Sequence, residues 1–122
     1  MLKDSLYKIT SQDHHDGVID AILEINKEDS IFNGHFPGHP VLPGACMLQI
    51  IKEVLEDTLK ASFRLKKADQ IKFLAISDPL INNILKLKLT YSIDDINFNV
   101  IGNFSQIDIC CKFKGTFVEL KS

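Results

Sequence analysis

The chain has 122 residues, the size of one ordinary domain, and we expect residues 1–122 to form a single unit. Fourteen basic and sixteen acidic residues leave a net charge of −2, which argues against a dedicated nucleic-acid-binding protein. No apolar run approaches the roughly twenty residues of a membrane-spanning helix, and the N-terminus lacks the apolar stretch of a signal peptide. We therefore expect a soluble, cytoplasmic protein with neither nucleic-acid nor membrane partners.

The first half of the chain predicts a strand, a shaped loop and a long helix. Apolar and polar residues alternate over 18–26, which is typical of a half-buried strand. The segment 30–44 holds three of the four prolines and three of the six glycines, so it cannot be regular structure. A largely apolar helix is expected from about Pro43 to Lys60, with a narrow polar stripe formed by Gln49, Lys52, Glu53, Glu56 and Lys60.

The second half predicts one strand after another. Strands are expected at 71–76, 84–91, 96–100 and 107–113, with turns at 77–83, 94–95 and 103–106. Connections this short favour antiparallel neighbours. The fold class is therefore α+β, with one long apolar helix lying on a curved antiparallel sheet.

The three cysteines are Cys46, Cys110 and Cys111, an odd number without C-x-x-C spacing. We expect buried, reduced thiols. A nucleophilic Cys46 at the helix start is the alternative, and its apolar neighbours argue against it.

The loop before the helix carries the most informative residues. His35 lies in a turn shaped by proline and glycine, and Gly44 falls in the first turn of the predicted helix. The start of a helix has unpaired N–H groups, and a glycine there lets a carbonyl approach the backbone. An imidazole beside such a donor suits proton abstraction next to a carbonyl. On spacing alone, a loop that merely shapes the helix entry, with His35 as an ordinary polar residue, is an equal alternative.

The string H-F-P-G-x-P-V-x-P-G over residues 35–44 resembles the signature of the 3-hydroxyacyl-(acyl carrier protein) dehydratases, the FabA/FabZ type of the hot-dog superfamily. The resemblance implies a hot-dog fold and a lyase that forms a trans-2-enoyl thioester in fatty acid or polyketide-like biosynthesis. It implies no cofactor, an acyl carrier protein or coenzyme A thioester as substrate, and a homo-oligomer of at least two chains.

The same resemblance assigns roles to individual residues. His35 removes the proton from C2 of the acyl group, the Gly44 N–H polarises the thioester carbonyl, and the Val41 carbonyl orients the imidazole. Substrate contact is implied for Phe36, Val41, Phe73 and Leu74; for Phe73 and Leu74, ordinary core residues are an equal alternative.

Gln49 stands where the family has a glutamate or aspartate that helps the hydroxyl to leave. An amide is no general acid near neutral pH, but it can hold the hydroxyl or a water. We expect protonated His35 to return the proton itself. A second route to protonation of the hydroxyl is through Glu53, which lies one turn along the helix and about 6 Å away and would act through a water. The alternative for Gln49 is an ordinary surface residue without a catalytic role.

Basic residues after the helix, Lys60, Arg64, Lys66 and Lys67, are the predicted docking site for an acidic carrier. We expect no metal, because the segment between His35 and His39 contains Pro37 and Gly38 and cannot be helical. Two other functions stay open: a hot-dog thioesterase, and a catalytically silent partner of an active dehydratase.

Overall fold

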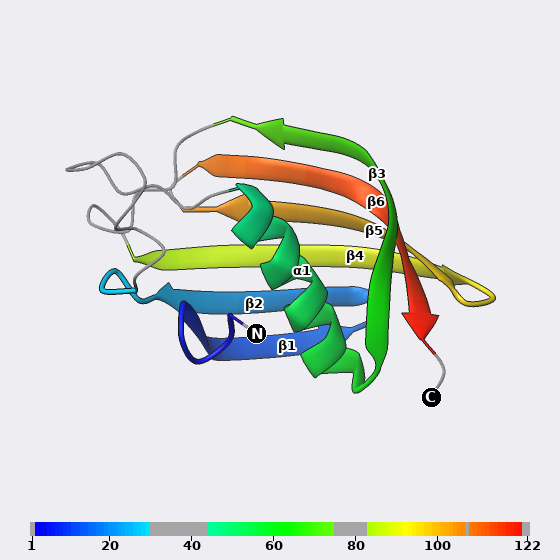
Figure 1. Ribbon diagram of the computed structural model, residues 1–122, viewed down its shortest axis with the longest axis horizontal. Coiled ribbons are helices and arrows are strands. Elements are labelled where there is room, and N and C mark those ends of the chain that lie inside the picture. Colours follow the sequence, from blue (N-terminus) through cyan, green and yellow to red (C-terminus); the bar gives the residue numbers. More distant parts are fainter. Residues whose placement is uncertain (1, 30–43, 75–82, 107, 121–122) are drawn as a thin grey trace.

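The computed structural model describes residues 2–29, 44–74, 83–106 and 108–120. One helix lies across one face of a six-stranded sheet with the strand order β1-β2-β4-β5-β6-β3, in which all neighbouring strands are antiparallel (Figure 1). The elements are β1 (Tyr7–His15), β2 (Val18–Ile25), α1 (Gly44–Leu59), β3 (Ser62–Phe73), β4 (Ile84–Asp94), β5 (Asn97–Ser105) and β6 (Ile109–Leu120). The α+β prediction of a long helix on a curved antiparallel sheet is confirmed.

The core lies between α1 and the sheet face that α1 covers. Alternate residues of β2 point into it, as the pattern predicts: Ile19, Ala21, Leu23 and Ile25 are buried. Gly102 on β5 leaves room for a core side chain of β4, because a Cβ added there would lie 3.0 Å from Leu89 Cδ2. The other strands and the helix add the following buried residues: Leu85, Leu87, Leu89, Phe98, Val100, Phe104, Phe113, Phe117, Ile50, Val54 and Leu55.

Tight turns join the hairpins and fix their register. Asp16 and Gly17 both have positive φ, 50° and 75°, in the two-residue connection between β1 and β2. This is the turn geometry that matches the twist of an antiparallel pair. Asp95 has φ 59° in the connection between β4 and β5, where the sequence predicts a turn.

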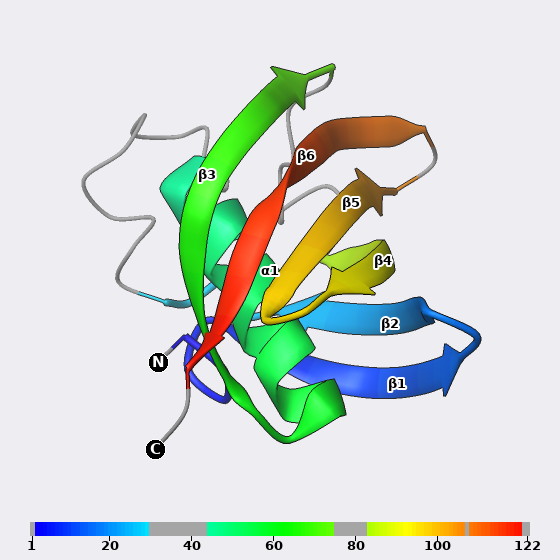
Figure 2. The same ribbon diagram turned by 90° about the vertical axis from the view of Figure 1, so that its right-hand side faces the viewer.

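Strand β3 differs from the prediction. It begins at Ser62, directly after the helix, and ends at Phe73, whereas the pattern predicts a strand over 71–76. Two irregularities in its pairing with β6, between Leu65 and Lys67 and between Ala68 and Gln70, break the alternation that would have revealed it. Figure 2 shows the strand bending around the edge of the sheet. Strand β5 also differs from the prediction. It continues to Ser105, so residues 103–105 belong to the strand and not to the predicted turn at 103–106.

The cysteines lie in the core. Cys46 at the start of α1 and the adjacent Cys110 and Cys111 on β6 are all free and buried. Burial raises the pKa of each of the three thiols. A raised pKa disfavours the thiolate, which argues against the nucleophilic role for Cys46.

Candidate active site

Gly44 is the first residue of α1, and the ring of Phe73 lies directly against it. A Cβ added at Gly44 would lie 2.6 Å from Phe73 Cζ, so the ring occupies the space that any other residue would need. Figure 1 shows the end of β3 beside the start of α1. Two residues predicted from the sequence, one as the carbonyl-polarising group and one as a substrate contact, are thus brought together by the fold.

The end of β3 is apolar and open to solvent. Phe73 is 58% exposed and Leu74 is 50% exposed. The Leu74 N–H donates to the carbonyl of Cys110 at 2.8 Å, which holds this end of the chain on β6. The end of β3 pairs with the start of β6, and each contributes one more exposed large hydrophobic residue there, Ile71 and Ile109. An exposed apolar surface beside the helix start is a suitable lining for an acyl chain.

The first turn of α1 is electrostatically suited to an anion. The first N–H groups of a helix have no partner within the helix and lie at the positive end of its dipole. No acidic residue occurs in the first turn of α1. A carbonyl that approaches this end would therefore be stabilised as negative charge develops on its oxygen.

Gln49 lies one and a half turns further along α1 and is half-buried. Its side-chain nitrogen Nε2 donates a hydrogen bond of 2.8 Å to Glu53 Oε2. Among the described residues, none donates a hydrogen bond to Gln49 Oε1. Oε1 is therefore the end of the carboxamide that does not face Glu53.

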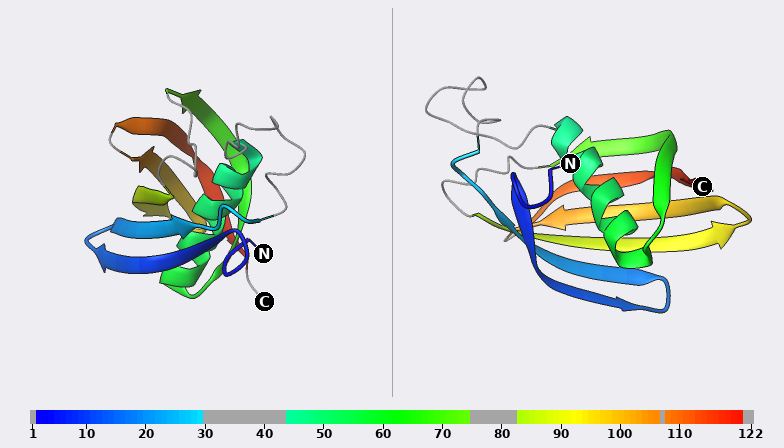
Figure 3. Two further views of the ribbon diagram at one scale, coloured as in Figure 1. Left: turned by 90° about the vertical axis from the view of Figure 1, so that its left-hand side faces the viewer. Right: turned by 60° about the horizontal axis from the view of Figure 1, so that its bottom comes forward.

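Glu53 is buried, with only 2% of its surface exposed, although the sequence places it on the polar stripe of the helix. Its carboxylate accepts hydrogen bonds from the Leu2 N–H (2.9 Å), the Lys3 N–H (2.8 Å) and the Tyr7 hydroxyl (3.0 Å), besides the one from Gln49. Figure 3 shows the N-terminal segment beside α1, which is where these donors come from.

The four donors determine the charge of Glu53. Burial raises the pKa of its carboxyl, but hydrogen bonds from Leu2, Gln49, Lys3 and Tyr7 outweigh this and lower the pKa below its ordinary value. Burial and the neighbouring carboxylate raise the pKa of the Tyr7 phenol in turn. Glu53 is therefore an ionised acceptor at neutral pH, and it has no proton to give to a departing hydroxyl. The route in which Glu53 acts as the acid is disfavoured.

Sequence reasoning missed the burial of Glu53 because its partners lie far away in the chain. One local signal was present: Ile50 and Val54, three residues before it and one after it, are apolar and buried. Glu53 therefore lies at the border of the apolar face, where a helical charge needs a partner. Which segment supplies that partner cannot be read from helical periodicity.

The predicted carrier-docking residues lie at the other end of the helix. Lys60 follows the last residue of α1, and the others are exposed on the first half of β3. The helix is about 24 Å long, so the structure does not bring this cluster next to Gly44. Lys66 Nζ lies 3.5 Å from Asn97 Oδ1, and Lys67 Nζ lies 3.3 Å from Asp69 Oδ1; Arg64 is exposed on the same strand.

Three predicted site residues, His35, Phe36 and Val41, lie outside the described residues, as does His39. Within the described ranges, no group of three histidine, cysteine or carboxylate side chains is placed to hold a metal ion. No described helix has both the length and the apolar character needed to cross a membrane.

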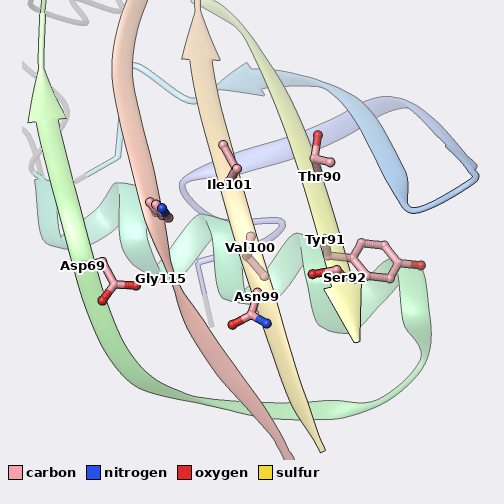
Figure 4. Close-up of a pocket in the computed structure, with 9 residues that line it drawn as sticks. Asp69, Thr90, Tyr91, Ser92, Asn99, Val100, Ile101 and Gly115 are labelled. Atoms are coloured by element: carbon pink, nitrogen blue, oxygen red, sulfur yellow. The ribbon is translucent and has the colours of Figure 1, made fainter. Parts of the chain in front are cut away.

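A pocket of about 230 Å³ lies on the face of the sheet that α1 leaves uncovered (Figure 4). Its lining comes from β3, β4, β5 and β6 and includes Asp69, Thr90, Asn99 and Lys114. None of the predicted site residues lines it. Its position on the outer face separates it from the helix start.

Comparison with known proteins agrees with this fold and motif. Residues 10–114 match the model of the ApeI-like family, described as ApeI dehydratase. A curated relative, the 3-hydroxyacyl-[acyl-carrier-protein] dehydratase FabZ of Syntrophobacter fumaroxidans, is 32% identical over 91 residues, which cover 59% of this chain and 62% of that protein. The chain spans less than two thirds of the length of the curated relatives it matches.

Solved structures share the fold at low sequence identity. The dehydratase heterocomplex ApeI:P from Xenorhabdus doucetiae has a chain with TM-score 0.74 and 18% identity, covering 91% of this chain and 96% of that one. A hypothetical thioesterase protein from Streptococcus pneumoniae TIGR4 has TM-score 0.67 and 11% identity, covering 98% and 93%, in a structure with coenzyme A. The fold is the hot-dog fold that the resemblance implies, and the chain belongs to the ApeI-like dehydratase family.

Proposed function

We propose that this protein dehydrates a 3-hydroxyacyl thioester to the trans-2-enoyl thioester. The observation that carries the proposal is the match to the ApeI-like dehydratase family over residues 10–114. This range includes the H-F-P-G string and Gly44 at the first position of α1.

In the proposed reaction, His35 removes the proton from C2 while the Gly44 N–H stabilises the charge that develops on the thioester oxygen. The electron pair of the broken C2–H bond forms the double bond between C2 and C3. The C3–O bond breaks, and the imidazolium of His35 returns its proton to the departing hydroxyl, which leaves as water. The Val41 carbonyl orients the imidazole, and the acyl group is contacted by Phe36, Val41, Phe73 and Leu74.

The geometry at the helix start supports the carbonyl-binding role of Gly44. The first turn carries no acid that would repel a developing oxyanion. The Phe73 ring packs on the glycine and supplies an apolar wall. Exclusion of water by such a wall strengthens the electrostatic stabilisation.

We further propose that the active unit contains at least two copies of the chain. Gly44 and Gln49 lie five residues apart, and therefore about 140° apart around the axis of α1. A substrate at the Gly44 end of one copy would meet the Gln49 side chain of another copy more readily than its own. Strand β3 is an edge of the sheet with exposed apolar residues at its end, which favours pairing with a second copy.

The acyl group is proposed to arrive on an acyl carrier protein or on coenzyme A. An acidic carrier would dock on Lys60, Arg64, Lys66 and Lys67. Charge reversal at Arg64 and Lys67 tests this: KM should rise for the carrier-linked substrate and stay unchanged for a small thioester. Lys86→Glu with Lys88→Glu, on the outer face of β4, is the matched control. Equal effects of the two double variants would contradict the docking site.

The test of the function itself is enoyl-thioester formation, followed by absorbance, in the wild type, His35→Ala and Gln49→Glu. Turnover in the wild type that disappears in His35→Ala supports the proposal. Turnover only in Gln49→Glu would make the chain a silent partner subunit, and the relative from Xenorhabdus doucetiae is itself part of a heterocomplex. Thiol release from a saturated acyl thioester, without enoyl product, would make it a thioesterase.

A further inference from the structure

We propose that Glu53 is a positioning residue that fixes the carboxamide of Gln49, so that Gln49 presents its oxygen, a hydrogen-bond acceptor, to the 3-hydroxyl of the substrate. This inference rests on the proposed function, since it assigns the group that meets the hydroxyl. It also gives Gln49 one definite role: it accepts a hydrogen bond from the substrate and does not donate one.

The hydrogen bonds of Glu53 determine which way round the carboxamide lies. The Leu2 and Lys3 N–H groups, at 2.9 and 2.8 Å, can only donate, so the carboxylate is required as an acceptor. An ionised carboxylate has no proton to offer Gln49 Oε1. The group of Gln49 that faces it at 2.8 Å must therefore be the nitrogen. This orientation follows from the chemistry of the partners.

Glu53 is the fixed member of the pair. It is 2% exposed and held from three other directions, by two backbone groups and the Tyr7 hydroxyl. Gln49 is half-buried and, among the described residues, is held by this one side-chain hydrogen bond. Because the two residues are four apart on α1, they share one face of the helix. The amide nitrogen is consequently drawn towards the buried Glu53 carboxylate, and Oε1 points away from it.

An acceptor at this position suits the step in which the hydroxyl leaves. The 3-hydroxyl of the substrate is a donor as well as an acceptor. When it donates to Oε1, its lone pairs are left free to receive the proton that His35 has taken from C2. Gln49 then orients the leaving group without protonating it, which matches the loss of the acid.

A double-mutant cycle tests this with kinetics. Glu53→Gln keeps the shape at position 53, and its Oε1 can still accept from the Lys3 N–H at 2.8 Å and from the Leu2 N–H at 3.2 Å. Its amide nitrogen would then face Gln49 and turn that carboxamide around. We expect kcat to fall about tenfold with KM changed less than about twofold. In the Gln49→Ala background, Glu53→Gln should have no further effect on kcat.

Glu56→Gln is the matched control, since Glu56 is on the same helix but accepts the Phe63 N–H at 2.8 Å near the other end. It should leave kcat within about twofold of the wild type. Independent, additive losses in the Glu53→Gln and Gln49→Ala variants would overturn the proposal, because a merely structural Glu53 would act equally in both backgrounds.

A second measurement does not depend on turnover. The side-chain amide of Gln49 can be followed by NMR in ¹⁵N-labelled protein and identified by its loss in Gln49→Ala. We expect one of its two protons to be shifted downfield and slow to exchange, and both properties to disappear in Glu53→Gln. An amide that is unchanged in Glu53→Gln overturns the positioning role. A held amide in a wild type that forms no enoyl product supports the positioning of Gln49 and overturns the dehydratase proposal.

Discussion

Glu53 places a negative charge inside a helix face that otherwise contacts the core. Four donors compensate for its burial, and three of them come from residues 2–7, more than forty positions away. A buried charge that loses its partners is strongly destabilising. This one carboxylate therefore ties the N-terminal segment to α1 and, through Gln49, to the candidate site.

The pH dependence of stability follows from the lowered pKa of Glu53. The unfolded chain, with the ordinary pKa of 4.5, takes up the proton before the folded protein does. The stabilisation is thus fully present above the ordinary pKa and is lost as the pH falls through the lowered folded-state pKa. We expect the wild type to lose more unfolding free energy on acidification from pH 6 than Glu53→Gln does. Urea unfolding across this range measures the difference.

Glu24→Gln, at an exposed position of β2, serves as the control for removing a carboxylate. It should follow the wild-type pH dependence. Identical slopes for Glu53→Gln and the wild type would show that Glu53 is not preferentially ionised in the folded protein.

Gly44 leads to a prediction at the same scale. In Gly44→Ala the new Cβ would lie 2.6 Å from Phe73 Cζ, so the ring must swing away from the helix start. We expect kcat/KM for dehydration to fall at least about tenfold, since the methyl group and the displaced ring both obstruct the approach to the N–H. Phe73→Ala in the same chain should recover part of the loss by making room. Ala45→Ser, at the exposed neighbouring position, should have little effect.

At the scale of the elements, α1 ends in a way that its sequence does not favour. Lys60 adopts φ 53°, and the following Ala61 N–H donates to the Glu56 carbonyl at 3.4 Å. This is the closing pattern in which glycine is usual at the left-handed position. A lysine there is strained relative to glycine.

Lys60→Gly should therefore stabilise the protein by about 0.5–1 kcal/mol, because it removes the strain at positive φ. The change in unfolding free energy should have the opposite sign at Lys52, inside the same helix, where a change to glycine should destabilise the protein by about 1 kcal/mol. Thermal or urea unfolding distinguishes the two. Destabilisation by Lys60→Gly would mean that the lysine side chain makes a compensating contact in solution.

The elements also show where sequence reasoning succeeds. Strand β2 alternates without interruption, so its buried residues were predictable from a period of two. Strand β3 contains two irregularities in its pairing and a charged first half, so its start at Ser62 could not be predicted from the pattern. The end of the helix was close to the prediction because the backbone conformation changes at Lys60, which has a positive φ of 53°.

For the whole molecule, the sheet has two edges, β1 and β3, and they differ in character. The end of β3 exposes Ile71, Phe73 and Leu74, whereas the exposed residues of β1 after Ile9 are all polar. Unpaired edges with apolar side chains promote association between chains. This asymmetry favours β3 as the surface at which two copies meet.

We expect sedimentation velocity to show at least a dimer, and Ile71→Lys combined with Leu74→Lys to shift it towards the monomer. Ile101→Lys, at an equally exposed position on the outer face of β5, should leave the assembly unchanged. A wild type that is monomeric and fully active would contradict both the interface and the shared site.

The candidate site was only partly predictable at this scale. The motif indicated Gly44 through its position at a helix start, but its contact with Phe73 depends on how β3 returns to the helix. The same is true of Gln49, whose orientation depends on Glu53 and thus on the N-terminal segment. Local patterns identify the groups, and the long-range packing of the chain determines how they face one another.

The buried thiols have a consequence of their own. Cys46 lies at the start of α1, and Cys110 and Cys111 lie on β6, so a reagent that alkylates thiols reaches them only when one of these elements opens. Their labelling rates count opening events at two separate places in the molecule. Thiol labelling of the folded protein therefore measures local unfolding of α1 and of β6 separately. Cys46 reports on the helix start, beside the proposed active site.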